Sequence, residues 1–251
     1  WEALSAELSS ATRVTISVDG AAAALDWHAA DWQGEPLVAR RAVAYSAGLE
    51  SPAPRPREPT DRPKMALVVA DPGTDLSGAR AEADAVSTLL GELFAVERLS
   101  GDAATRAAVT AGLERAEWLH FAGHGRFDEA SAWNSRLSLS GSDKLTIGDI
   151  VLLPRAPRGV VLSGCETGRA PQLSHALDVS LAAAFLAAGA ASVVAAARTV
   201  DDDLARRLST AVYAAMKDPE WNAPQALARA QRELWRDRPA TDWAAYRVWV
   251  R

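Results

Sequence analysis

The single cysteine and one of the four histidines stand where a thiol and an imidazole could act together. Cys165 follows the apolar run 159–162, and His124 follows the apolar run 118–121. Each run is typical of a short strand that leads into a polar residue, and ligands of open α/β sheets bind beyond the carboxyl ends of such strands. A thiolate can attack an electrophilic carbon while an imidazole transfers the proton. Cys165 and His124 are therefore candidate catalytic residues.

Glycines beside both residues add a second chemical element. Gly123 and Gly125 flank His124, and Gly164 precedes Cys165. Because glycine has no Cβ, the chain can turn sharply at these positions and direct backbone N–H groups into the crevice, where they could hold an oxyanion. Taken alone, Cys165 also fits a buried structural thiol at the end of a core strand.

Two alternative sites are weaker. Ser163 is a poor candidate nucleophile, because residues 161–165 do not form a Gly-x-Ser-x-Gly elbow. His120 and His124 are four residues apart, as in zinc-binding helices, but residues 118–125 are strand-like, so the two imidazoles would not share a helical face. No glutamate follows His120 and no third ligand is evident. We expect neither a metal nor a cofactor.

The composition indicates a globular protein of 251 residues, 49% of them hydrophobic. The net charge is −5 with both signs interspersed, so we expect no contact with nucleic acid. One cysteine cannot form an internal disulfide, which favours a cytoplasmic location. The uncharged run 179–197 is rich in alanine and interrupted by Gly189, so we interpret it as a buried helix and a strand, not as a membrane span. Because the sequence begins at Trp1, we expect it to be part of a longer protein.

Three regions differ in their patterns. Residues 1–50 are β-rich, with predicted strands over 13–18 and 37–45. Residues 51–64 contain five prolines, which predicts a linker or a long surface loop. Residues 65–251 alternate between strand and helix patterns and form the predicted core.

This alternation predicts an α/β fold with a mostly parallel sheet and helices on both faces. Residues 145–153 fit a short helix or a turn, and 243–250 a closing edge strand. The run Asp201 to Asp203 fits a helix N-terminus. Strands are predicted over 65–70, 94–99, 118–121, 137–139, 159–162 and 191–197, and helices over 79–93, 105–115, 204–216, 223–235 and a segment that Ser174 caps and Gly189 ends.

Several successive motifs together resemble the CHAT domain, a caspase-like family of clan CD cysteine peptidases related to caspases and separases. The motifs cover most of the chain in the family's order. They are 66–71, 78–82, 102–105, 119–125, 145–150, 161–168, 184–190 and 243–246.

The resemblance implies a caspase-like sheet preceded by a small β-rich segment, and a cysteine endopeptidase dyad. Cys165 would be the nucleophile and His124 the proton-transfer residue, while the backbone N–H groups of Gly125 and Cys165 would bind the oxyanion. It also implies a protein or peptide substrate, no membrane contact, and an upstream sensor or repeat domain or an activating partner. The alternative is an inactive member that serves as a protein-interaction module. A redox thiol is less consistent, because no second cysteine could resolve a disulfide.

One departure from the family pattern concerns specificity. Relatives commonly have Trp-Pro-Val-Asp near the specificity pocket, where this chain has the run from Arg198 to Asp202. An arginine that points inward would favour an acidic residue before the scissile bond, whereas an inward Asp201, Asp202 or Asp203 would favour Lys or Arg. The sequence leaves this choice open, with Arg198, Asp201 and Asp202 as candidate substrate-binding residues.

Overall fold

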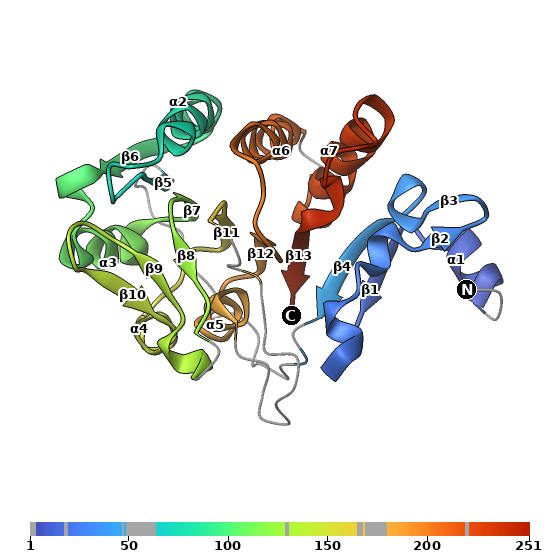
Figure 1. Cartoon of the computed structure of the whole chain (residues 1–251), viewed down its shortest axis with the longest axis horizontal. Coiled ribbons are helices and arrows are strands. Elements are labelled where there is room, and N and C mark those ends of the chain that lie inside the picture. The colour runs from blue at the N-terminus through green and yellow to red at the C-terminus, as the bar shows by residue number, and fades with distance from the viewer. Residues whose placement is uncertain are drawn as a thin grey trace.

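An eight-stranded sheet is built from both ends and the middle of the chain (Figure 1). The computed structural model describes residues 4–17, 20–46, 48, 64–128, 131–164, 168, 180–218 and 221–251. In spatial order the strands are β1 (Arg13–Ile16), β4 (Ala42–Ser46), β13 (Tyr246–Val250), β12 (Ser192–Ala196), β11 (Gly159–Leu162), β7 (Trp118–Ala122), β5 (Met65–Ala70) and β6 (Ala95–Ser100).

Within the eight-stranded sheet, all but one of the strand pairings are parallel, which confirms the predicted mostly parallel sheet. Strands β12, β11, β7, β5 and β6 run in one direction, and β1, β4 and β13 run in the other, so the two groups meet at the antiparallel pair β12–β13. The expectation that residues 243–250 form an edge strand is wrong. Strand β13 pairs with β12 on one side and with β4 from the N-terminal segment on the other. The contact with β4 joins positions about 200 residues apart, which local alternation cannot reveal.

Helices cover both faces of the sheet, as predicted (Figure 1). The central strands are buried on both sides, and their successive residues therefore enter opposite cores. Val68, Val161 and Val194 pack on one side, and Leu67, Val160 and Val193 on the other. The first side carries α2 (Ser77–Gly91), α6 (Asp202–Ala215) and α7 (Ala223–Asp237), and the second carries α3 (Arg106–Arg115), α4 (Ile147–Val151) and α5 (Leu181–Ala187).

Side-chain caps define where several helices begin. Thr105 accepts a hydrogen bond from the N–H of Ala108 at the start of α3. Ser180 does the same for α5, whereas Ser174, the predicted cap, lies outside the described residues. Gly189 follows α5 with a φ of +117°, which agrees with its predicted role as the stop of that helix.

The predicted strand over 37–45 is only partly correct. Leu37 and Val38 are buried in a single turn of 3₁₀-helix, η4 (Leu37–Ala39), and the strand begins at Ala42. The N–H of Leu37 donates to the carbonyl of Ala30, which holds that turn away from the sheet. The same segment contains α1 (Ser5–Ser10), η2 (Gly20–Ala24), η3 (Trp27–Ala29) and the two-stranded pair β2 (Asp31–Trp32) and β3 (Glu35–Pro36).

A small antiparallel sheet follows the central strand β7. It consists of β8 (Gly125–Arg126), β9 (Arg136–Ser138) and β10 (Lys144–Thr146), and β10 runs directly into α4. Residues 145–153 thus begin as a strand end and continue as the expected short helix. Short 3₁₀ turns complete the elements, η5 (Gly101–Ala103), η6 (Ala132–Asn134) and η7 (Trp243–Ala245). None of the helices in the described ranges is long and apolar enough to cross a membrane.

Candidate active site

His124 lies just beyond the carboxyl end of β7, at the edge of the sheet where ligands bind parallel α/β folds. Its side chain is 51% exposed. Gly123 lets the chain pass close to the neighbouring loop, since a Cβ at this position would lie 3.0 Å from Cδ of Pro72. The strand end therefore presents an accessible imidazole beside the loop between β5 and α2.

The pairing of β7 with β11 is a second feature of this edge. Leu162 is paired with Phe121, and the N–H of Ser163 donates to the carbonyl of Phe121 at 2.8 Å. Paired positions differ by 41 in number, and the same difference separates Cys165 from His124 in the sequence.

Cys165 itself lies outside the described residues. On its N-terminal side, Gly164 is the second residue after β11. On its C-terminal side, the N–H of Gly168 donates to the carbonyl of Ala196 at 2.8 Å. The chain on both sides of the cysteine is thus held at the carboxyl ends of adjacent strands, β11 and β12.

A carboxylate that the sequence analysis did not identify contacts His124. Nε2 of His124 is 3.1 Å from Oδ2 of Asp75, and this hydrogen bond lowers the pKa of Asp75 below its usual value. The ionised carboxylate can only accept, so Nε2 carries the proton. Nδ1 of the neutral imidazole is then the proton acceptor.

Asp71 organises the loop that holds Asp75. It is buried, has a φ of +43°, and its Oδ1 accepts from the N–H groups of Asp75 and Leu76, both at 2.9 Å. Its other oxygen pairs with Arg80 on α2. The N–H of Asp71 donates to the carbonyl of Ala122 at 2.8 Å, which ties the loop to the end of β7. Asp75 is therefore positioned by the backbone, although its own side chain is exposed.

The predicted oxyanion donor Gly125 is the first residue of β8 in the small sheet. Gly125 is paired with Leu137, and the N–H of Ser138 donates to the carbonyl of His124. Because hydrogen-bonded and non-hydrogen-bonded pairs alternate in an antiparallel ladder, the N–H of Gly125 points away from β9. It is therefore directed away from the ladder, where it could serve a ligand.

His120 has an environment opposite to that of His124. Its side chain is fully buried, and Nε2 lies 3.4 Å from Oε1 of the buried Glu82 on α2. Burial lowers the pKa of His120 to about 3 and raises that of Glu82 to about 7. One histidine thus belongs to the core and the other to the surface, and their rings do not form a shared metal-binding face.

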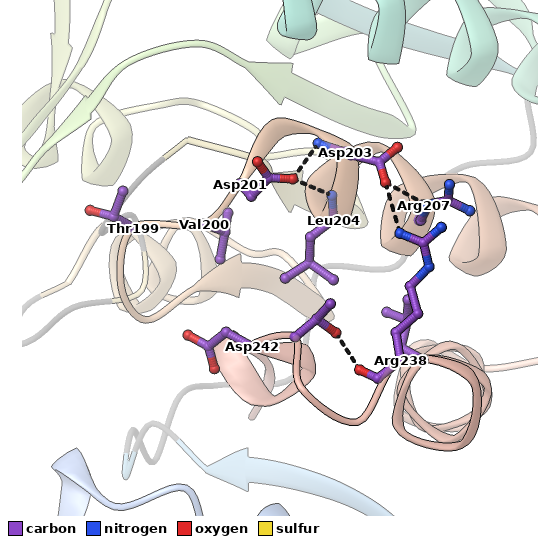
Figure 2. Close-up of a pocket in the computed structure, with 10 residues that line it drawn as sticks. Thr199, Val200, Asp201, Asp203, Leu204, Arg207, Arg238 and Asp242 are labelled. Atoms are coloured by element: carbon purple, nitrogen blue, oxygen red, sulfur yellow. Dashed lines mark hydrogen bonds and ion pairs between the residues drawn. The ribbon is translucent and has the colours of Figure 1, made fainter.

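The three candidate substrate-binding residues have different partners. The guanidinium of Arg198 pairs with Asp26 at 2.8 Å and with Asp242 at 2.5 Å. Asp201 caps α6, because its Oδ1 accepts hydrogen bonds from the N–H groups of Asp203 and Leu204 (Figure 2). These contacts hold Arg198 and Asp201 to other parts of the chain.

Asp202 is exposed and lies against the first turn of α2. A Cβ on Gly78 would lie 2.0 Å from its carboxylate, so only glycine allows this approach. Asp202, at the start of α6, therefore lies beside the start of α2, the helix that follows the loop of Asp75.

A pocket of about 200 Å³ opens between the start of α6 and the end of α7 (Figure 2). Val200, Leu204 and Leu234 give it an apolar wall. Most of its charged residues are engaged, because Asp203 binds Arg207 at 2.6 Å and Arg238 at 3.4 Å, and Asp242 binds Arg198 outside the pocket. The lining holds three aspartates and two arginines, with Asp201 occupied as the cap of α6.

The comparison with protein families decides the identity of this arrangement. The family model described as CHAT domain matches residues 1–251. The chain belongs to the CHAT family. No curated protein matches the sequence of this CHAT domain.

Solved structures share the fold of the CHAT domain at low identity. Separase in the Saccharomyces cerevisiae separase–securin complex has a TM-score of 0.61 at 10% identity, and the match covers 90% of this chain and 15% of the separase chain. The Arg-specific cysteine proteinase gingipain R has a TM-score of 0.57 at 11% identity, covering 74% of this chain and 46% of its own. A complex of the pro- and mature domains of the Porphyromonas gingivalis protein has a TM-score of 0.55 at 10% identity, and the match covers 74% of this chain and 47% of that chain. These likenesses confirm the caspase-like fold, and the CHAT domain spans less than half of each of these chains.

Asp75 shows what the sequence analysis of the CHAT domain missed. Asp75 comes five residues after the predicted strand 65–70 and 49 residues before His124 in the chain. The available signal was a polar residue just after a predicted parallel strand, because such residues collect at one edge of the sheet. Because β5 pairs with β7 in parallel, the residues that follow the two strands lie side by side, and Asp75 contacts His124.

Proposed function

We propose that this CHAT domain is a cysteine endopeptidase with Cys165 as nucleophile and His124 as proton-transfer residue. The observation that carries the proposal is the register of β7 and β11, since the offset of 41 between paired residues equals the offset between His124 and Cys165. The caspase-like fold and the exposed imidazole at the strand end support the same chemistry.

In the proposed reaction, Nδ1 of His124 accepts the thiol proton and the sulfur attacks the peptide carbonyl carbon. The N–H groups of Gly125 and Cys165 stabilise the oxyanion that forms. Collapse of this intermediate breaks the C–N bond, and the imidazolium gives its proton to the leaving amine. Water then hydrolyses the thioester and restores the thiol. Asp75 holds the ring through Nε2 throughout.

For the substrate we propose a protein with Lys or Arg before the scissile bond. Arg198, Asp201 and Asp202 remain the proposed substrate-binding residues, with Asp202 as the charged residue that selects the basic side chain. Arg198 is held by two aspartates and Asp201 caps α6, while the carboxylate of Asp202 is exposed. A peptide mixture varied at the position before the scissile bond tests this preference, and cleavage after Asp or Glu would contradict it.

We further propose that the domain is the regulated effector of a longer cytoplasmic protein, with an upstream sensor or repeat domain or an activating partner. The single cysteine is compatible with a reducing compartment. Because His124 is exposed at the edge of the sheet, another domain or partner could cover it and so control the access of a protein substrate.

The decisive experiment uses the single cysteine as a built-in reporter. A peptide-derived electrophile should label the wild-type protein at Cys165, and Cys165→Ala should abolish both labelling and peptide cleavage. His124→Ala should lower cleavage by at least about 1000-fold while leaving the folded state intact. Full cleavage activity in either variant would contradict the dyad. Failure of the wild type both to label and to cleave would instead favour an inactive domain that binds partners.

A further inference from the structure

A buried carboxylate links the end of β11 to other elements of the core. Glu82 on α2 is 3% exposed, and its Oε2 accepts from the hydroxyl of Ser163 at 2.9 Å. Its Oε1 accepts from the hydroxyl of Ser209 on α6 at 2.6 Å. The hydroxyl of Ser163 is also 3.0 Å from that of Tyr246 on β13. One carboxylate therefore connects α2, β11 and α6 directly, and β13 through Ser163.

A chain of polar side chains lies beside this carboxylate. Trp118 donates its indole N–H to the hydroxyl of Tyr213 at 3.1 Å, which leaves the Tyr213 proton for Nδ1 of His120 at 3.0 Å. Nε2 of the neutral His120 then carries the single N–H of the ring and lies 3.4 Å from Oε1 of Glu82. The two serine hydroxyls are thus the hydrogen-bond donors to Glu82, whereas Nε2 of His120 lies near the carboxylate without a hydrogen bond to it.

The buried charge is costly, and its immediate surroundings do not neutralise it. Burial raises the pKa of Glu82 to about 7, and the nearby charged groups act in opposite directions, since Asp202 raises it and Arg206 lowers it. His120 is neutral because its own pKa is low. A carboxylate in the core carries a desolvation penalty that an apolar residue would not, which points to a role for Glu82 other than stability.

We propose that Glu82 is a positioning residue for the proposed active site, because it fixes the end of β11 through Ser163. Ser163 is the first residue after β11 and precedes Cys165 by two positions in the sequence. A hydroxyl bound to a carboxylate is a strong, directional contact, so it restrains the strand at the point where the proposed nucleophilic loop begins. The inference rests on the proposed function for the identity of the reacting thiol.

The chain offers a matched pair of variants. Ser163→Ala and Ser209→Ala each remove one hydroxyl donor from the same carboxylate, but only Ser163 directly follows β11. The first readout is the rate at which iodoacetamide alkylates the single cysteine as a function of pH, which needs no peptidase activity. The second is kcat and KM for a peptide substrate of the wild type.

Ser163→Ala should slow alkylation and lower kcat by about tenfold with an unchanged KM, and Ser209→Ala should change either by less than about threefold. Both variants should lose similar thermal stability, because each leaves the same carboxylate short of one donor. Equal alkylation rates in the two variants, whether fast or slow, would overturn the inference. If the wild type cleaves no peptide, the proposed function fails, and the alkylation rates still decide the role of Glu82.

Glu82→Gln and Glu82→Ala complete the design. Glutamine keeps an acceptor oxygen for Ser163, so Glu82→Gln should retain at least about a third of the wild-type alkylation rate, while Glu82→Ala should match Ser163→Ala. Equal alkylation of Glu82→Ala and wild type, in protein shown to be folded by circular dichroism, would overturn the inference. If Glu82→Ala does not fold, the two serine variants carry the test.

Discussion

Two histidines four residues apart, His120 on β7 and His124 just beyond its end, each face a carboxylate, and the two pairs behave in opposite ways. His120 faces Glu82 at 3.4 Å with both side chains buried, and His124 contacts Asp75 at 3.1 Å with side chains 51% and 61% exposed. Both carboxylates come from the same strand–loop–helix unit, β5–α2. The two pairs contain the same kinds of chemical group and differ in how far their side chains are exposed to solvent.

The difference shows how burial decides the role of such a pair. In the core, desolvation disfavours both charges, so the pKa of His120 falls and that of Glu82 rises. At the sheet edge, water solvates both groups, and the hydrogen bond from His124 lowers the pKa of Asp75. The buried pair is suited to hold elements together, and the exposed pair is suited to transfer a proton.

The sharpest way to break the comparison is to truncate each histidine. His120→Ala should reduce the free energy of unfolding by about 2–4 kcal/mol, because it opens a cavity in the core and removes the acceptor of the Tyr213 hydroxyl. His124→Ala should change it by less than about 0.5 kcal/mol, since the side chain is half exposed. Urea unfolding followed by circular dichroism measures both, and a larger loss for His124→Ala would refute the assigned roles.

The pH dependence of stability provides a second contrast. Because the folded-state pKa of Glu82 is about 7 and its ordinary value is 4.5, the folded state favours the protonated acid. This stabilisation is fully present below pH 4.5 and is lost as the pH rises to 7. The free energy of unfolding of the wild type relative to Glu82→Gln should therefore fall by about 3 kcal/mol across that range.

His28 and His120 also titrate in this range, and their effect has the opposite sign. Burial lowers their pKa values to about 4 and about 3, so their contribution is lost as the pH falls below 6.5. The contribution of burial to both pKa values is common to the wild type and Glu82→Gln and cancels in their difference. Urea unfolding of both proteins from pH 4.5 to 8 measures the remainder, and parallel curves would show that Glu82 is ionised in both states.

The smallest expected effect concerns the exposed carboxylate. Asp75→Asn should lower kcat for peptide cleavage by about tenfold, because an amide can donate as well as accept and no longer selects the ring form with the proton on Nε2. Thermal stability should stay unchanged, because the side chain is exposed. Wild-type kcat in Asp75→Asn would remove Asp75 from the mechanism, and Asp84→Asn on the outer surface of α2 is the matched control.

Local sequence patterns determined much of this fold. The predicted strands over 65–70 and 159–162 agree with β5 and β11 at both ends, because continuous apolar runs bounded by turn residues have few other ways to be buried. The helix starts at Thr105 and Asp201 follow from their side chains, which cap nearby N–H groups. The expected partnership of His124 and Cys165 came from their places after two such strands and stays a prediction.

Tertiary structure alone decided the contacts between distant segments. Pairing with β4 turned the expected edge strand β13 into an interior strand, and the β5–α2 loop brought Asp75 to His124. The packing of the other elements also made His120 fully buried and left His124 half exposed, although the two residues are only four positions apart. The physical reason is that hydrophobic periodicity specifies which face of an element is buried, whereas strand order and the local exclusion of water depend on every other element that packs against it.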